Sequence, residues 1–164
     1  MNSIDKINSL NKSEFINFFG NIFEKSEWIA EEVFKSKPYK SLENFKSKFV
    51  YIFENIKSEE VIKILNSHPE LVVEKNLTTD STQEQNSANL NNCTKEEFEE
   101  FKDLNYKYKK KFGFPFIIAV KGMNRLEILN NFRIRIKKDN ESELNEAKEQ
   151  VKKIASIRLD QAIK

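Results

Sequence analysis

TKEEFEEFKDLNYKYKKKFG, residues 94–113, contains the clearest helix signals in the chain. Thr94 and Glu97 have the spacing of a capping box, in which each side chain accepts a hydrogen bond from the other residue's backbone N–H. Acids crowd the first turns, lysines crowd the last, and Gly113 follows as a stop. The apolar positions recur at helical spacing: Phe98, Phe101, Leu104, Tyr108 and Phe112. We predict one long helix that buries this stripe.

Segments on both sides of this helix repeat the pattern. Residues 15–23 place Phe15, Phe18, Phe19, Ile22 and Phe23 on one face, and Asn11 with Glu14 matches a capping box. Further helices are expected near residues 28–34, 42–56, 58–67, 81–90, 124–136 and 142–159. Three glycines and three prolines against 14 phenylalanines favour long elements with an aromatic core.

Residues 114–120, FPFIIAV, are short, apolar and bounded by Gly113 and Gly122, which indicates a buried extended segment. A chain of 164 residues is long enough for one substantial core and short for two. We therefore predict an all-α fold over residues 1–164: a compact single-domain bundle of about six to eight helices with one extended apolar segment near 114–120.

Composition excludes several classes of function. The net charge of +2 gives no global reason for binding nucleic acid or a membrane surface. One cysteine and one histidine cannot form an internal disulfide or a typical zinc site, and no phosphate-binding or dinucleotide-binding glycine motif occurs. The N-terminus is polar and no apolar run approaches about 18 residues, so we expect a cytoplasmic protein without a membrane span.

The lysine-rich run at residues 107–112 is the one feature that suggests nucleic-acid binding, with Tyr106 and Tyr108 as stacking groups. Lysines at a helix C-terminus are sufficiently explained by the helix dipole and by solubility. We therefore expect no nucleic-acid partner.

His68 is the only histidine, and Pro69 after it should end the preceding helix. A histidine at a helix end is more often structural than catalytic. It is nevertheless the best acid or base that the chain offers near neutral pH.

Ser81, Glu84 and Gln85 form a polar group with two interpretations. The S-x-x-E spacing is that of a capping box, which would occupy both side chains at a helix start. Arg158 also has two interpretations: its head can reach solvent along its helix, or it can hold a carboxylate with its planar fork. The residues alone leave these alternatives open.

Taken in order, four motifs resemble one known family. They are HPEL at 68–71, LTTDSTQEQ at 77–85, KFGFPFIIAVKG at 111–122 and KIASIRLD at 153–160. In this order they resemble the 2-oxo-4-hydroxy-4-carboxy-5-ureidoimidazoline (OHCU) decarboxylases, which complete the conversion of urate to allantoin. The resemblance covers the chain from the first phenylalanine-rich helix onward.

The resemblance implies roles for particular residues. The family's catalytic pair falls on His68 and Glu84. Its substrate-binding residues fall on Pro69, Ser81, Gln85, Phe116, Ile117, Ile118, Ala119, Val120 and Arg158. Two positions depart from the family pattern, because Ser67 and Asn89 stand where glycine is usual; a larger side chain at 89 could re-aim the adjacent helix.

The resemblance also implies an activity: decarboxylation of OHCU to (S)-allantoin and CO₂ by an all-helical homodimer that needs no cofactor or metal. The alternative is a helical interaction module derived from this family that has lost catalysis. Asn89 and the lysine-, asparagine- and isoleucine-rich composition are its support in the sequence.

Overall fold

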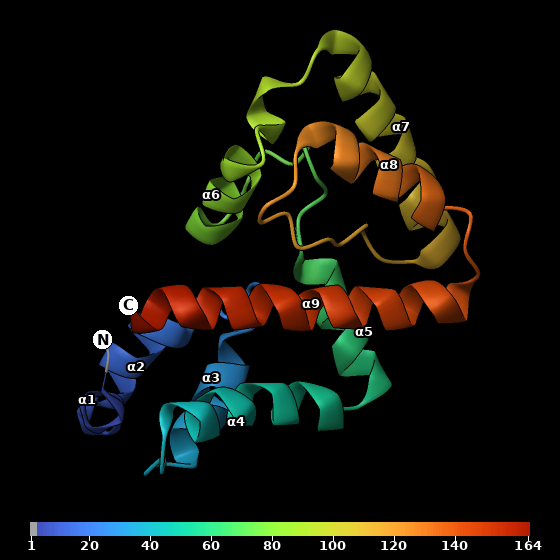
Figure 1. The fold of residues 1–164 in the computed structure, drawn as a ribbon. Coiled ribbons are helices and arrows are strands. Elements are labelled where there is room, and N and C mark those ends of the chain that lie inside the picture. The colour runs from blue at the N-terminus through green and yellow to red at the C-terminus, as the bar shows by residue number, and fades with distance from the viewer. Residues whose placement is uncertain (1–2) are drawn as a thin grey trace. The chain divides into compact units, whose positions relative to one another are not determined.

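The computed structural model describes residues 3–164, and within that range it contains helices and no strand. The helices are α1 (Ile4–Ser9), α2 (Lys12–Phe19), α3 (Glu27–Lys35), α4 (Leu42–Asn55), α5 (Ser58–Ser67), α6 (Thr79–Ser87), the 3₁₀ helix η1 (Leu90–Asn92), α7 (Lys95–Phe112), α8 (Arg125–Arg135) and α9 (Asn140–Ile163) (Figure 1). The predicted all-α class is confirmed. The number of α-helices in the described residues, nine, is one above the predicted range.

The helix termini follow the capping signals closely. Thr94 caps α7 with the predicted capping box to Glu97, and Gly113 ends it with φ 81°. Asn11 caps α2 in the same way. The start of α9 was predicted two residues late, because the Asp139 carboxylate accepts a hydrogen bond from the Ser142 backbone N–H at 2.8 Å and the helix begins at Asn140.

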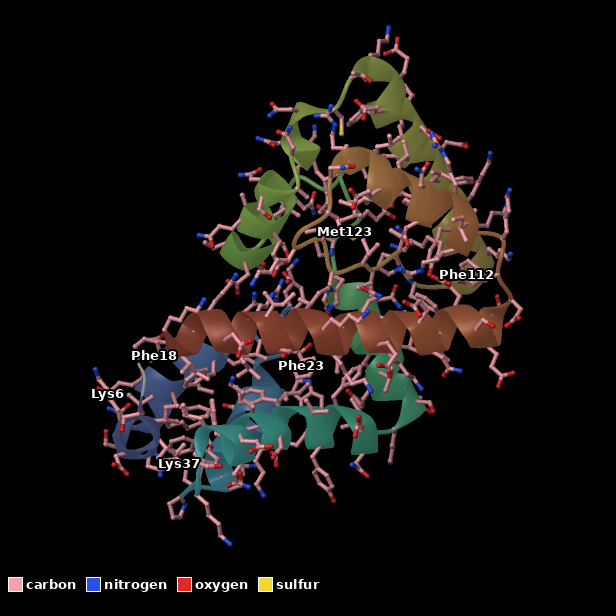
Figure 2. The ribbon with its side chains drawn as sticks, viewed as in Figure 1. Lys6, Phe18, Phe23, Lys37, Phe112 and Met123 are labelled. Carbon is pink, nitrogen blue, oxygen red and sulfur yellow. The ribbon has the colours of Figure 1, made fainter. Side chains whose placement is uncertain are left out.

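The structure divides into two compact units, of which the first holds the described residues up to Ser67 together with Lys152–Lys164. Its core is a cluster of aromatic rings on α2 and α4. Phe15 and Phe19 contact Phe45. Phe23, which follows α2 and is labelled in Figure 2, stacks on Phe53 with ring centroids 5.0 Å apart. The predicted stripe over residues 15–23 is wrong at Phe18, which is 49% exposed.

The second unit covers His68–Val151. Here α7 and α8 lie side by side (Figure 1), and the Phe116 and Phe132 rings stack 3.9 Å apart with Tyr108 against both. The buried residues of α7 are Phe101, Asn105 and Tyr108.

The predicted stripe of α7 is wrong at Phe98, which is 39% exposed. Asn105 takes a core position, since its side-chain amide donates to the Leu71 carbonyl at 2.9 Å. Phe98 lies at the end of the first turn of α7, and Asn105 lies about two turns later on the same face. The buried stripe therefore begins at Phe101 and includes a polar residue.

No helix within the described residues is long and apolar enough to cross a bilayer.

Asn89, the residue that stands where the resembled family has glycine, has a left-handed backbone conformation with φ 62° and ψ 24°. Glycine adopts this conformation without strain, and asparagine tolerates it better than most other residues. Its side chain also accepts a hydrogen bond from the Asn92 amide at 2.7 Å. The departure from glycine therefore leaves the turn between α6 and η1 intact.

We predict that Asn89→Ala lowers the free energy of unfolding by about 1 kcal/mol, because alanine is strained in this conformation. Asn89→Gly should change it by less than about half of that. Urea unfolding followed by circular dichroism measures both. An equal loss in the two variants would assign the effect to the lost asparagine side chain, contrary to this prediction.

Candidate functional site

His68 lies immediately after α5, where Pro69 ends the helix as predicted. The His68 side chain is buried, with 8% of the residue exposed. It is the first residue of the second unit, which also contains α6 and the extended segment. Histidine is intermediate among residue types in how often it is buried, so burial alone does not decide between a structural and a catalytic role.

The loop that follows His68 is held by two buried amide side chains. The Leu71 carbonyl accepts from Asn105 on α7, and the Val72 backbone N–H donates to Gln85 Oε1 on α6 at 3.1 Å. Val72 itself has a positive backbone angle, φ 73°. This conformation is strained for a β-branched residue and persists only where the surroundings impose it. The two amides therefore fix the path of the chain just after His68 and Pro69.

Helix α6 begins before Ser81, so the prediction that Ser81 and Glu84 form a capping box at its start is wrong. Thr78 is the N-cap, and its hydroxyl oxygen accepts from the Ser81 backbone N–H at 3.3 Å. Ser81 and Gln85 lie one turn apart on the buried face, whereas Glu84 is half-buried. A helix that turns serine and glutamine inward is unusual, because burying polar groups costs free energy unless they bind something.

Gln85 has a second notable feature. Its Oε1 is engaged by Val72, which fixes the orientation of the amide group. Its Nε2 is buried and has no hydrogen-bond partner among the described residues. An unsatisfied buried donor is costly, which makes this N–H₂ group a candidate donor to a ligand.

The segment 114–120 is extended and buried, as predicted, apart from half-buried Ala119. It forms no strand; two side chains from other elements bind its backbone instead. Arg135 Nη1 on α8 donates to the Ile117 carbonyl at 2.7 Å, and the Ala119 N–H donates to Gln150 Oε1 on α9 at 2.9 Å. Side-chain hydrogen bonds replace a neighbouring strand and fix this segment in place.

Arg135 is also part of a buried ionic network. Its Nε donates to Glu143 Oε1 at 2.7 Å, and the Tyr108 hydroxyl donates to the same oxygen. Burial, reinforced by the Glu143 carboxylate, raises the pKa of the Tyr108 hydroxyl well above its usual value. Tyr108 therefore stays protonated and remains a donor, and the network joins α7, α8, α9 and the extended segment.

We predict that Arg135→Met costs about 3–5 kcal/mol of stability, because it leaves the Glu143 carboxylate buried without its cation. Urea unfolding measures the loss.

The matched control adds Glu143→Gln to Arg135→Met. This double variant should be more stable than Arg135→Met alone, since no uncompensated charge is then buried. If the double variant is equally unstable, the loss comes from the Ile117 hydrogen bond and packing, and the charge argument fails.

Arg158 lies in the part of α9 that belongs to the first unit. Its Nη2 donates to Glu24 Oε2 at 2.7 Å and its Nη1 donates to the Asn21 carbonyl at 2.8 Å. The side chains of Arg158 and Glu24 are 2% and 0% exposed. The alternative in which this arginine reaches solvent is therefore wrong, and the guanidinium does hold a carboxylate, one supplied by the chain itself.

The sequence predictions missed the residues that support the site. Three buried polar residues support the site: Asn105, Arg135 and Gln150. The spacing of apolar residues, from which the helices were predicted, does not identify them. A polar residue at a core position of an amphipathic helix could have indicated such a role. Asn105 is an example, because it lies in register between Phe101 and Tyr108. The described residues contain no group of three or more His, Cys, Asp or Glu side chains suited to a metal ion.

The family model for OHCU decarboxylase matches residues 8–160. The chain belongs to the OHCU decarboxylase family. It is 32% identical over 157 residues to the 2-oxo-4-hydroxy-4-carboxy-5-ureidoimidazoline decarboxylase of Haloferax volcanii, covering 96% of this chain and 94% of that protein.

The chain is also 37% identical over 161 residues to the uric acid degradation bifunctional protein of Bacillus sp. (strain TB-90). That match covers 98% of this chain and 32% of the relative, and the Bacillus subtilis protein PucL is likewise covered to 32%. The chain thus spans about a third of the length of these bifunctional relatives.

Two solved structures share the fold. A crystal structure of (S)-allantoin synthase matches all of this chain and 54% of its own, with a TM-score of 0.81 and 26% identity. A crystal structure of OHCU decarboxylase in the presence of (S)-allantoin matches 93% of this chain and 99% of its own, with a TM-score of 0.70. At 20% identity the second match shows the fold alone.

Proposed function

We propose that this chain decarboxylates OHCU to (S)-allantoin and CO₂ without a cofactor, in the degradation of urate. The family match over residues 8–160 and the Haloferax decarboxylase, covered to 94% of its length, support this proposal. Because the family match includes most of both units, we also propose that they belong to one decarboxylase-like domain.

The observation that carries the proposal is the buried polar face of α6. Ser81 and Gln85 are 3% and 7% exposed, and Gln85 Nε2 has no hydrogen-bond partner among the described residues. A ring rich in carbonyl and ureido groups would supply the acceptor that this amide needs. We assign Ser81 and Gln85 to binding the ring and its ureido group.

The substrate carries the electron sink that decarboxylation needs. Its ring has a carboxylate and a hydroxyl on one carbon and an imine at the next, which bears the ureido group. When the bond to the carboxylate breaks, its electron pair forms a carbon–carbon double bond and the imine nitrogen accepts the charge. The imine nitrogen takes up a proton, the hydroxyl then loses its proton as a carbonyl forms, and the ureido-bearing carbon gains a proton. One proton is therefore taken up for each CO₂ released.

The protein's task is therefore to orient the substrate and to move protons. We assign that work to His68 and Glu84, with His68 acting at the hydroxyl or carboxylate side. The fixed loop after Pro69 supports this assignment, because a proton donor must be held steady to protonate one face only. One-sided protonation gives one enantiomer of allantoin.

The segment from Phe116 to Val120 is proposed to line the substrate pocket. Its fixation by Arg135 and Gln150 supports this role, because a rigid backbone can present N–H and carbonyl groups to a ligand.

Arg158 is proposed to recognise the substrate's negative charge. From the resemblance we further propose that the active form is a cytoplasmic homodimer.

We predict that His68→Ala lowers turnover of freshly generated OHCU by about 100-fold or more, as expected for loss of a general acid or base. Circular dichroism during turnover measures the growth of the (S)-allantoin signal, and a far-ultraviolet spectrum checks the fold. Full activity of folded His68→Ala would contradict the assignment.

Glu84→Gln is the companion variant, and we expect a comparable loss because the amide cannot exchange a proton. Glu99→Gln, an exposed glutamate on α7, is the matched control and should be fully active. A folded wild-type protein that forms allantoin no faster than buffer would refute the proposed function and favour the interaction module.

For Arg158→Lys we expect a KM at least about tenfold higher with a smaller change in kcat, since lysine lacks the planar fork that holds a carboxylate. Glu24→Gln is the control, because it weakens the Arg158–Glu24 ion pair and keeps the guanidinium. Initial rates and thermal melts measure both variants. An equal rise of KM in both would mean that Arg158 acts only by supporting the first unit.

A further inference from the structure

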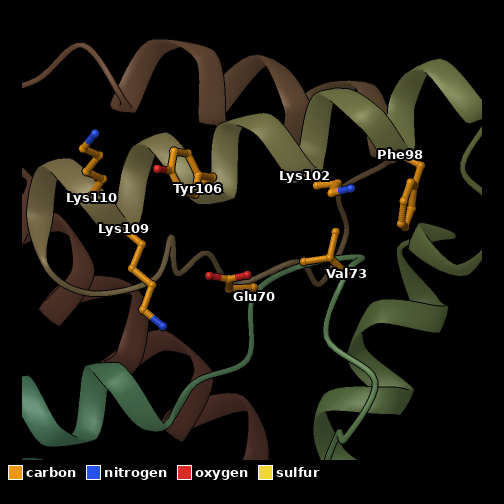
Figure 3. A pocket seen from close by; sticks show the side chains of 7 residues that line it. All are labelled: Glu70, Val73, Phe98, Lys102, Tyr106, Lys109 and Lys110. Atoms are coloured by element: carbon orange, nitrogen blue, oxygen red, sulfur yellow. The ribbon is translucent and has the colours of Figure 1, made fainter.

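A cavity of about 720 Å³ lies on the exposed side of α7, outside the residues assigned to catalysis. Its lining residues all belong to the second unit: Glu70, Val73, Phe98, Lys102, Tyr106, Lys109 and Lys110. Figure 3 shows Glu70 and Val73, from the loop after α5, below the ribbon of α7, with the Lys109 side chain reaching down beside Glu70. The volume falls in the range of small-molecule sites, about 300–1,000 Å³.

Two aromatic rings form the apolar part of this cavity. Phe98 is 39% exposed and Tyr106 is 67% exposed, although both are large side chains on a helix with a well-packed core face. Their positions, eight residues apart with Lys102 between them, place all three along one face of α7. Exposed rings beside a cavity offer flat surfaces on which a planar ligand can stack.

The charged groups of the cavity are mostly positive. Three lysines and one glutamate give the lining a net charge of +2 (3 − 1). No ion pair of Lys102, Lys109 or Glu70 occurs in the described part of the chain, whereas Lys107 on the same helix pairs with Asp103 at 2.7 Å. Lys110 lies 5.9 Å from the centre of the Tyr106 ring. The lysines are therefore available to an anion from solution.

We propose that this cavity is a second binding site, for a planar aromatic or heteroaromatic anion that bears a carboxylate or phosphate. The ring stacks on Tyr106, and Phe98 with Val73 forms the apolar wall at the other end of the cavity (Figure 3). Lys102 or Lys109, each about one turn from Tyr106 along α7, binds the anionic group. Glu70 accepts a hydrogen bond from a ring N–H or O–H. The lining includes neither His68 nor Ser81, so the proposal does not rest on the proposed activity.

The test is isothermal titration of the full chain with phenyl phosphate at low salt. We expect one saturable site per chain. Phenol, which keeps the ring, and inorganic phosphate, which keeps the charge, should each bind at least tenfold more weakly. Equal binding of inorganic phosphate would overturn the proposal. So would the absence of saturation by phenyl phosphate at about 10 mM, which corresponds to very weak binding.

Variants locate the site. Lys102→Met combined with Lys109→Met should weaken phenyl phosphate at least tenfold, and Lys107→Met, outside the cavity on the same helix, should not. Tyr106→Ser should also weaken it, whereas Tyr51→Ser, an equally exposed tyrosine in the first unit, should not. Equal effects of the test and control variants would overturn the proposal.

Sedimentation velocity separates a small ligand from a second copy of the chain. Under the proposal, Tyr106→Ser leaves the association state of the protein unchanged. A shift of the association equilibrium in this variant, with Tyr51→Ser unaffected, would assign the face to protein contact and overturn the small-ligand site.

Discussion

The ion pair between Arg135 and Glu143 is the interaction on which the second unit depends. It joins α8 to α9, draws in Tyr108 from α7, and leaves the arginine one further donor for the Ile117 carbonyl. Because Glu143 is 1% exposed, each member needs the others to offset the cost of burial. Without this network, the extended segment would have no partner for that carbonyl, since no neighbouring strand occurs in the described residues.

A second constraint acts on the loop after His68. Gln85 and Asn105 hold it from α6 and α7, and Val72 keeps a strained conformation between them. The two ends of the Gln85 amide therefore differ: its oxygen fixes the loop, and its nitrogen has no hydrogen-bond partner among the described residues. An unpaired buried donor costs stability, and under the proposed function this cost keeps a donor available to the substrate.

Local sequence rules predicted most of the helices and several of their ends. Capping residues such as Thr94 and Asn11 act within one helical turn, so their effect does not depend on distant parts of the chain. The same rules failed at Ser81, because Thr78 offers an equivalent cap one turn earlier. They failed at Phe98 because apolar periodicity marks a helix face but not how far along the helix that face is covered, and Phe98 lies in the first turn of α7. The family motifs indicated the candidate site residues, but not which groups hold them in place.

The sequence by itself determined the helical class, the extended segment and the family, because periodicity, capping and motif order are properties of neighbouring residues. Only the tertiary structure decided that Arg135 and Gln150 fix residues 114–120, that Gln85 holds Val72, and that Arg158 is buried against Glu24. These contacts join residues 13 to 134 positions apart. Hydrogen bonds over such separations depend on how the helices pack, which no local pattern encodes.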